Sequence, residues 1–165
     1  MKQFSLFKLK NSKQVKFPSS SIFTTIFVIL GLIYSVMLLG VYLTSSHQGL
    51  SCLTWPLCPN GFDFPPPKYF YEHIHRFLVL VLSIALFSFT VFAYKKIPDK
   101  KIRVKLLIAS ILLTAQILLG WLVIFTRLNP FVVASHLSNA VALFGIILIT
   151  LLSIHNEIKK EKMKI

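Results

Sequence analysis

The sequence predicts an all-α integral membrane protein, folded as a four-transmembrane-helix up-down bundle with both termini cytoplasmic. Of its 165 residues, 55% are hydrophobic and 14% are charged, whereas a soluble domain is typically about 45–50% apolar and about 25% charged. Four long apolar stretches stand out, and the basic residues behind the net charge of +13 lie almost entirely outside them. This composition excludes a disordered chain and argues against an ordinary soluble enzyme.

The four apolar stretches are the expected membrane-spanning helices, at about residues 21–43, 70–94, 105–125 and 131–155. Each approaches the ~20 residues with which a helix crosses a ~30 Å hydrocarbon core. None alternates between apolar and polar residues as barrel strands do, so helices are expected. The chain then divides into a basic tail at 1–20, a transmembrane domain at 21–155 with an outer loop at 44–69, and a second basic tail at 156–165.

The positions of the basic residues predict the orientation. All but three of the 18 Lys and Arg residues lie in the two tails or between the second and third helices; the exceptions are Lys68, Arg76 and Arg127. Because basic residues concentrate on the cytoplasmic side, both termini are expected in the cytoplasm and the outer loop outside the cell membrane. The net charge therefore indicates membrane topology, with lipid as a partner, and no nucleic acid partner is expected.

Two cysteines, Cys52 and Cys58, lie in the predicted outer loop. On the extracytoplasmic side disulfides persist, so a short-loop disulfide is plausible there. The spacing leaves other states open, since two thiols can also bind a metal or stay reduced. A disulfide could serve as a structural staple or take part in redox chemistry. Two cysteines are too few for a protein held together by a disulfide framework.

The second predicted helix begins with ionisable residues in the segment YEHIHR, residues 71–76. Such residues in membrane helices usually face the bundle interior or a water-filled cavity. Glu72 lies three residues before His75, on the same face, and four before Arg76, with which it can pair. His73 is about 200° around the helix from His75, so the two cannot both point inward, and Glu72 favours His75. The alternative for His75 is a simple polar anchor.

His136, in the fourth predicted helix, is the counterpart of His75. His75 precedes Tyr94 by 19 residues, and His136 precedes His155 by 19 residues. At ~1.5 Å per residue, both histidines lie roughly 28 Å from the inner boundary. The second and fourth helices of an up-down bundle are parallel and diagonal, so both imidazoles can point to a central ligand. Two imidazoles at one level are typical of haem iron ligation; polar anchoring is the alternative.

Other residues near this level allow both a site role and an ordinary one. Arg76 and Arg127 could pair with the propionates of a haem, which are carboxylates, or could be interfacial anchors. Gln116 could hydrogen-bond across helices. Gly120 could make room for a flat macrocycle, although close helix packing is the more frequent reason for a glycine in a membrane helix.

Three segments resemble the haem A synthase family: GLSCLTWPLCPNG at Gly49–Gly61, EHIHR at Glu72–Arg76, and LGWLVIFTRLNPFVVASHLSNA at Leu119–Ala140. The resemblance covers roughly residues 40–140, with the motifs in the family's order. Most members carry two four-helix halves, one holding haem b and the other receiving haem O. The resemblance implies that this chain is equivalent to one half. It also implies an enzyme that oxidises the C8 methyl group of haem O to a formyl group. The product, haem A, serves terminal cytochrome oxidases.

The resemblance also implies roles for individual residues. His75 and His136 match the paired axial ligands of the haem iron, and the haem could be haem b, haem O or haem A. Glu72 matches the carboxylate of the family's Glu-x-x-His-Arg motif, which is associated with catalysis. Cys52 and Cys58 match an outer-loop pair thought to form a disulfide. The implied partners are the substrate haem O, another copy of the chain in a homo-oligomer, and a haem O synthase.

The chain departs from the family pattern in three places. Tyr42 stands where members usually have an arginine, and Leu53 and Thr54 stand where they usually have Pro-Asp. The usual Thr-Gly-Ser-Gly turn is replaced by the segment Thr44–Gly49. These differences leave the matched histidines in place but weaken the expectation of normal substrate handling.

Three other functions fit parts of the sequence. A non-catalytic haem b-binding protein for oxidase assembly or electron transfer would keep His75 and His136 without needing Glu72. A four-helix disulfide-generating enzyme that passes electrons to quinone would normally need a second cysteine pair, and the chain has only two cysteines. A structural membrane subunit would bind no chromophore.

Overall fold

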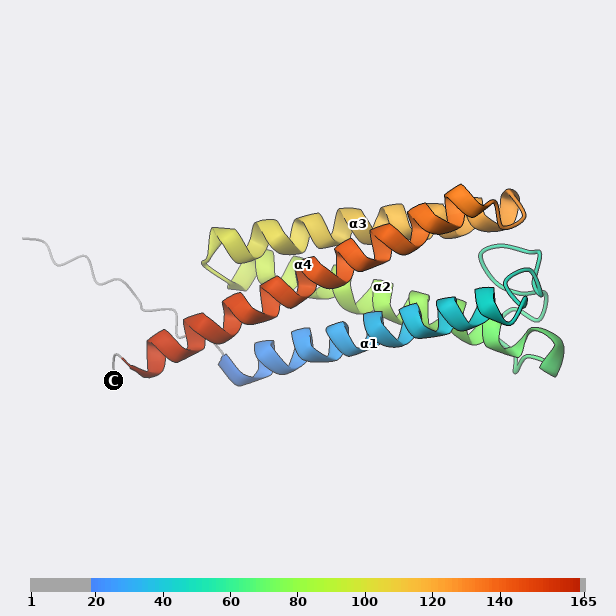
Figure 1. Ribbon diagram of the computed structural model, residues 1–165. Coiled ribbons are helices and arrows are strands. Elements are labelled where there is room, and N and C mark those ends of the chain that lie inside the picture. Colours follow the sequence, from blue (N-terminus) through green and yellow to red (C-terminus); the bar gives the residue numbers. More distant parts are fainter. Residues whose placement is uncertain (1–18, 164–165) are drawn as a thin grey trace, which may run out of the picture.

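The computed structural model describes residues 19–163. Its helices are α1 (Ser19–Ser45), α2 (Phe70–Lys96), α3 (Lys100–Phe125) and α4 (Pro130–Lys162), with a short 3-10 helix, η1 (Pro67–Tyr69), before α2. All four α-helices are long and apolar enough to cross a membrane, which confirms the predicted four-helix membrane bundle (Figure 1). The lysines predicted for the tail before residue 19, and Lys164, lie outside the described residues.

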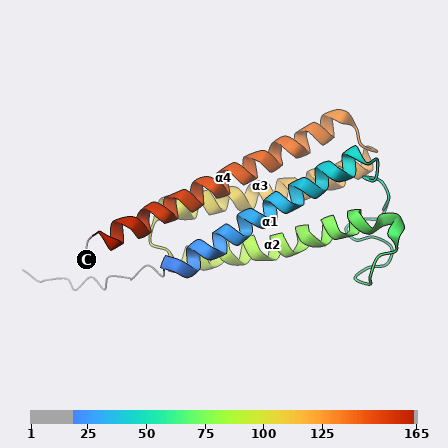
Figure 2. The same cartoon turned by 60° about the horizontal axis from the view of Figure 1, so that its bottom comes forward.

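The helices pack in a ring. α1 packs against α2 and α4, and α3 packs against the same two helices, whereas α2 and α4 make no close backbone contact within residues 19–163. Figure 2 shows α1 in front between α4 and α2, with α3 behind. α2 and α4 are therefore diagonal and run in the same direction, as the sequence predicts for an up-down bundle.

The connections divide between the two ends of the bundle. The beginning of α1, the α2–α3 connection and the end of α4 lie at one end, and the long loop after α1 and the α3–α4 turn lie at the other (Figure 1). We call the second end the loop end. The basic α2–α3 connection and the outer loop that carries Cys52 and Cys58 therefore lie at opposite ends of the molecule, as the predicted topology requires.

All four helices are longer than the sequence-based expectation, α1 and α2 by a few residues and α3 and α4 by more. α3 begins at Lys100 rather than near residue 105, because the Asp99 side chain accepts a hydrogen bond from the Lys101 backbone N–H at 2.7 Å and caps the first turn. α4 begins at Pro130, beside the expected Asn129 turn, and continues to Lys162 instead of ending near residue 155. A hydropathy boundary marks where a helix leaves the apolar region, and helices can continue beyond that boundary.

The close-packed core fills only the part of the bundle away from the loop end. Its buried residues in α2 extend from Leu82 to Ala93, and those in α4 extend from Leu143 to Ile154. His75 precedes Leu82 by seven residues, and His136 precedes Leu143 by seven residues. At ~1.5 Å per residue, both histidines lie roughly 10 Å beyond the core, at the same height toward the loop end.

Candidate functional site

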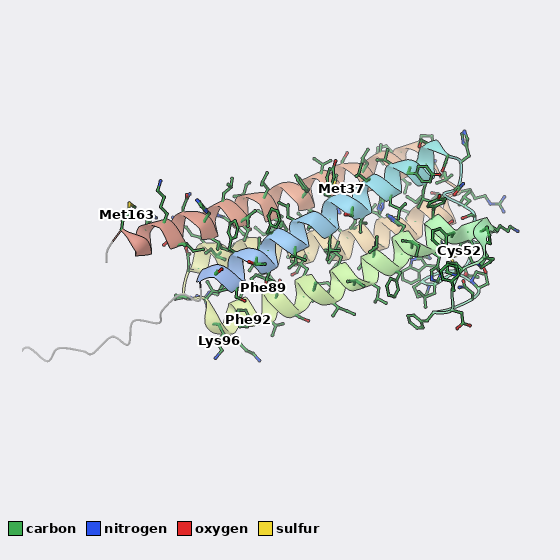
Figure 3. The ribbon with its side chains drawn as sticks, turned by 90° about the horizontal axis from the view of Figure 1, so that it is seen from below. Met37, Cys52, Phe89, Phe92, Lys96 and Met163 are labelled. Atoms are coloured by element: carbon green, nitrogen blue, oxygen red, sulfur yellow. A yellow bond between two sulfur atoms is a disulfide. The ribbon has the colours of Figure 1, made fainter. Side chains whose placement is uncertain are left out.

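The outer loop is closed by a disulfide. Cys52 and Cys58 are bonded, with their Cα atoms 5.5 Å apart, and both residues are buried. Among the states that the spacing left open, the disulfide is therefore the one found. Figure 3 shows Cys52 in the loop beside the beginning of α2, so the disulfide lies next to the first turns of that helix.

A buried ion pair joins this loop to α2. The Glu72 carboxylate, 4% exposed, accepts hydrogen bonds from Ser51 Oγ at 2.8 Å and from the Cys52 backbone N–H at 2.9 Å. Its other oxygen lies 2.5 Å from Arg76 Nη2, which confirms the predicted pair. Arg76 also donates to the carbonyl oxygens of Cys52, at 2.7 Å, and Thr54. Charge-assisted hydrogen bonds of this kind are among the strongest in proteins.

The two arginines predicted near the site differ in their surroundings. The Arg76 guanidinium is engaged with the outer loop, and its side chain is only 11% exposed. Arg127 is exposed in the α3–α4 turn, where its backbone is left-handed, with φ 51°. Arg127 is therefore the more accessible of the two for an anionic ligand at the loop end.

His75 lies against α1 at a glycine. A Cβ atom added to Gly40 would be 3.2 Å from His75 Cε1, closer than side chains normally pack, and 3.8 Å from His75 Nδ1. The His75 Nδ1 atom is buried and has no hydrogen-bond partner. Gly40 thus lets the imidazole lie directly on the α1 backbone, in a position that depends on the absence of a side chain there.

His136 lies against α3 in the same way. A Cβ atom added to Gly120 would be 3.4 Å from His136 Cε1, and the Gln116 amide nitrogen lies 3.2 Å from His136 Nε2. Asn139 Nδ2 donates to Gln116 Oε1 at 2.6 Å and to the Leu112 carbonyl oxygen at 3.0 Å. A chain of polar groups therefore runs between α3 and α4 and ends on the imidazole.

Sequence reasoning found part of this arrangement. It identified Gln116 as a residue able to hydrogen-bond across helices, but it missed Gly40 and Asn139. A glycine on α1 and an amide on the His136 helix carry no strong signal until their neighbours are known. His73, expected on the opposite face from His75, is itself buried at 6% exposed, and its Nδ1 atom lacks a partner. His75, expected to be the inward histidine of the pair, is only partly buried, so its face of α2 is not the more enclosed one.

The two imidazoles form a donor set that fits a haem iron. They come from diagonal helices, stand at one height beyond the core, and lie against Gly40 and Gly120. Across residues 19–163, no three His, Cys, Asp or Glu side chains are grouped as a bare metal ion would need. Axial ligation by two histidines requires no third protein ligand, because the macrocycle supplies the equatorial nitrogens.

Comparison with known proteins places the chain among oxidase assembly proteins. Residues 61–164 match a family model described as "Cytochrome oxidase assembly protein". The matched segment contains Glu72, His75, Gln116 and His136, and it begins after the cysteine pair.

Curated relatives agree with the family match. The protein named "Heme A synthase" from Macrococcus caseolyticus is 33% identical over 119 residues, which are 70% of this chain and 39% of that protein. Its namesake from Lysinibacillus sphaericus is 28% identical over 135 residues, 79% of this chain and 44% of that protein. The one from Geobacillus kaustophilus is 31% identical over 120 residues. The chain spans about two-fifths of the length of these relatives.

Proposed function

Given that the chain belongs to the cytochrome oxidase assembly protein family, we propose that it is a membrane haem A synthase. In this proposal the C8 methyl group of haem O becomes a formyl group with its oxygen taken from water, and the four electrons and four protons released pass to an external acceptor, making haem A for terminal cytochrome oxidases. The observation that carries the proposal is the placement of His75 and His136, on diagonal helices and each against a glycine. The relatives named "Heme A synthase" support the choice of reaction.

His75 and His136 are the proposed axial ligands of the iron, in haem b or in haem O and haem A. Bound haem would supply the redox chemistry, which the protein orients and shields. Because Gly40 and Gly120 lack side chains, the two rings can lie close to α1 and α3. The long apolar helices keep water away from the rings. Arg127, exposed at the loop end, is the proposed partner of a propionate.

Glu72 is the proposed catalytic carboxylate, one helical turn from His75. Three donors already converge on it: Ser51 Oγ, the Cys52 N–H and Arg76 Nη2. A carboxylate offers about four acceptor positions, so about one remains for a proton released during the oxidation. In this proposal Glu72 both receives a proton and holds the disulfide loop over the end of the bundle.

Orientation and partners complete the proposal. We place both termini in the cytoplasm and the disulfide loop outside, because the basic α2–α3 connection lies at the end opposite the loop. Substrate haem O would come from a haem O synthase. A second four-helix unit would come from another copy of the chain, in a homo-oligomer.

A second candidate function is a non-catalytic haem b-binding protein that assists oxidase assembly or electron transfer. One observation favours it: every hydrogen bond formed by the Glu72 carboxylate goes to the cysteine loop or to its own helix. Such a pattern also suits a purely structural carboxylate. Under this alternative, the two histidines keep their role and Glu72 has none in chemistry.

Haem analysis separates the two functions. The full chain is expressed in membranes together with a haem O synthase, and the haems of the purified protein are extracted and identified by chromatography. The synthase proposal predicts haem A from the native chain and none from His75→Leu or His136→Leu. His155→Gln, at an exposed histidine on α4, is the matched control and should make haem A normally. Haem b bound without any haem A would support the second candidate instead.

A further inference from the structure

The hydrogen bonds around the side-chain amides of Asn139 and Gln116 determine which way each amide is turned. Asn139 Nδ2 lies 3.0 Å from the Leu112 carbonyl oxygen, which can only accept a hydrogen bond. The Asn139 side-chain atom next to this carbonyl oxygen must therefore be the nitrogen of the amide NH2 group, not the amide oxygen. The same NH2 lies 2.6 Å from Gln116 Oε1, so the Gln116 oxygen faces Asn139 and the Gln116 NH2 faces His136.

This orientation determines which imidazole nitrogen carries the proton. The Gln116 NH2 lies 3.2 Å from His136 Nε2, and an amide NH2 can only donate. His136 Nε2 must then be an unprotonated acceptor, and the proton of the neutral ring sits on Nδ1, which is buried and has no competing partner. A neutral imidazole has one N–H, so the hydrogen bond to Gln116 selects one of two tautomers.

We propose that Gln116 and Asn139 are positioning residues that hold His136 in its Nδ1–H tautomer, with the Nε2 lone pair ready for a metal. The inference rests on the proposed function, in which His136 is an axial ligand of haem iron. Before haem binds, Gln116 donates a hydrogen bond to the Nε2 lone pair that would later bind the iron. Asn139 donates to Gln116 Oε1, which prevents the Gln116 amide from rotating by 180°. Asn139 also donates to the Leu112 carbonyl oxygen of α3. The two amides therefore keep their orientation when the hydrogen bond between Gln116 and His136 is broken.

The packing around the ring supports this role. Gly120 and Gln116 are one helical turn apart on α3; a Cβ atom added to Gly120 would meet His136 Cε1 at 3.4 Å, and Gln116 contacts the neighbouring ring atom Nε2. The missing side chain at Gly120 lets the ring lie close to α3, and Gln116 restrains it by a directed hydrogen bond. All three polar side chains are partly buried among apolar helices, where little water competes for their hydrogen bonds.

The tautomer can be measured without haem. The full chain is prepared with 15N-labelled histidine in lipid nanodiscs, and the His136 signals are assigned by their loss in His136→Gln. The 15N shifts of a ring distinguish a protonated nitrogen from an unprotonated one. The native protein should show a protonated Nδ1 and an unprotonated Nε2 at His136. Gln116→Leu and Asn139→Leu should each raise the share of the Nε2–H tautomer several-fold.

A matched control separates positioning from general packing. Ser110 Oγ and Thr90 Oγ1 are 3.0 Å apart and also join α3 to a neighbouring helix, within the close-packed core. Ser110→Ala removes that contact and should leave the His136 signals unchanged. A native His136 with the proton on Nε2, or a tautomer that neither leucine variant shifts, would overturn the inference. Because no haem is present, this result is independent of the proposed function. A haemin titration of native protein and His136→Gln tests the ligand role of His136 separately, and the haem analysis above tests the synthase reaction.

Discussion

The Glu72 carboxylate accepts a hydrogen bond from the backbone N–H of Cys52 at 2.9 Å, across 20 residues of sequence. This contact joins the first turn of α2 to the disulfide loop, and Arg76 strengthens it from the same helix by donating to the Cys52 carbonyl oxygen at 2.7 Å. The loop is therefore fixed to the helix that carries His75. The position of the loop relative to this helix therefore depends on Glu72.

The first prediction concerns the stability of this contact. Glu72→Gln removes the negative charge that Arg76 binds and places an NH2 group among existing donors. A hydrogen bond to a charged group contributes about 1.5–3 kcal/mol, so the variant should open the loop roughly tenfold more often. The rate at which dithiothreitol reduces the Cys52–Cys58 disulfide measures this opening. Asp63→Asn, at an exposed carboxylate in the same loop, should reduce at the native rate, and equal rates for both variants would show that Glu72 does not hold the loop.

The second prediction concerns the glycine beneath His75. Gly40→Ala places a methyl group 3.2 Å from His75 Cε1, and overpacking of this kind typically costs about 1–3 kcal/mol. The imidazole must move, so haemin affinity in a spectroscopic titration should fall several-fold or more. Gly31→Ala on the same helix is the matched control, because an added Cβ there meets nothing within 4 Å. If both alanine variants bind haemin as the native protein does, the glycine contact has no role in ligand geometry.

The third prediction concerns orientation in the membrane. A cysteine at Phe62, which is 73% exposed in the outer loop, should react with a membrane-impermeant maleimide in intact cells. A cysteine at Lys96, exposed at the end of α2, should react only after the membrane is permeabilised. Positive-inside topology predicts this pattern. The native disulfide-bonded chain should stay unlabelled, and the reverse pattern would place the disulfide loop in the cytoplasm.

Much of the fold follows from the sequence for simple physical reasons. Four apolar stretches of sufficient length can only be helices in lipid, because every backbone polar group must be satisfied within the segment. The helix ends were less predictable, since α3 starts at a side-chain cap on Asp99 and α4 continues through polar residues to Lys162. Neither feature changes the hydropathy pattern on which the expected boundaries rested.

The site was predictable where periodicity governs it. The spacing of four residues predicted the Glu72–Arg76 pair, because residues four apart meet on a helix. The outer loop has no such period, so its hydrogen bonds to Glu72 could not be foreseen. Gly40 and Asn139 act through contacts between helices, which depend on how each helix is rotated within the bundle. The roles of His75 and His136 in ligation stay predictions.

Electron paramagnetic resonance of the purified ferric protein distinguishes axial ligation by His75 and His136 together from ligation by other residues. If both histidines bind the iron, the native protein should give a low-spin signal typical of two imidazole ligands. Each single variant, His75→Leu and His136→Leu, should lose that signal and give a high-spin one, while His155→Gln keeps it. A low-spin bis-imidazole signal that survives in either leucine variant would contradict ligation by this pair, because the iron would then be held by other residues.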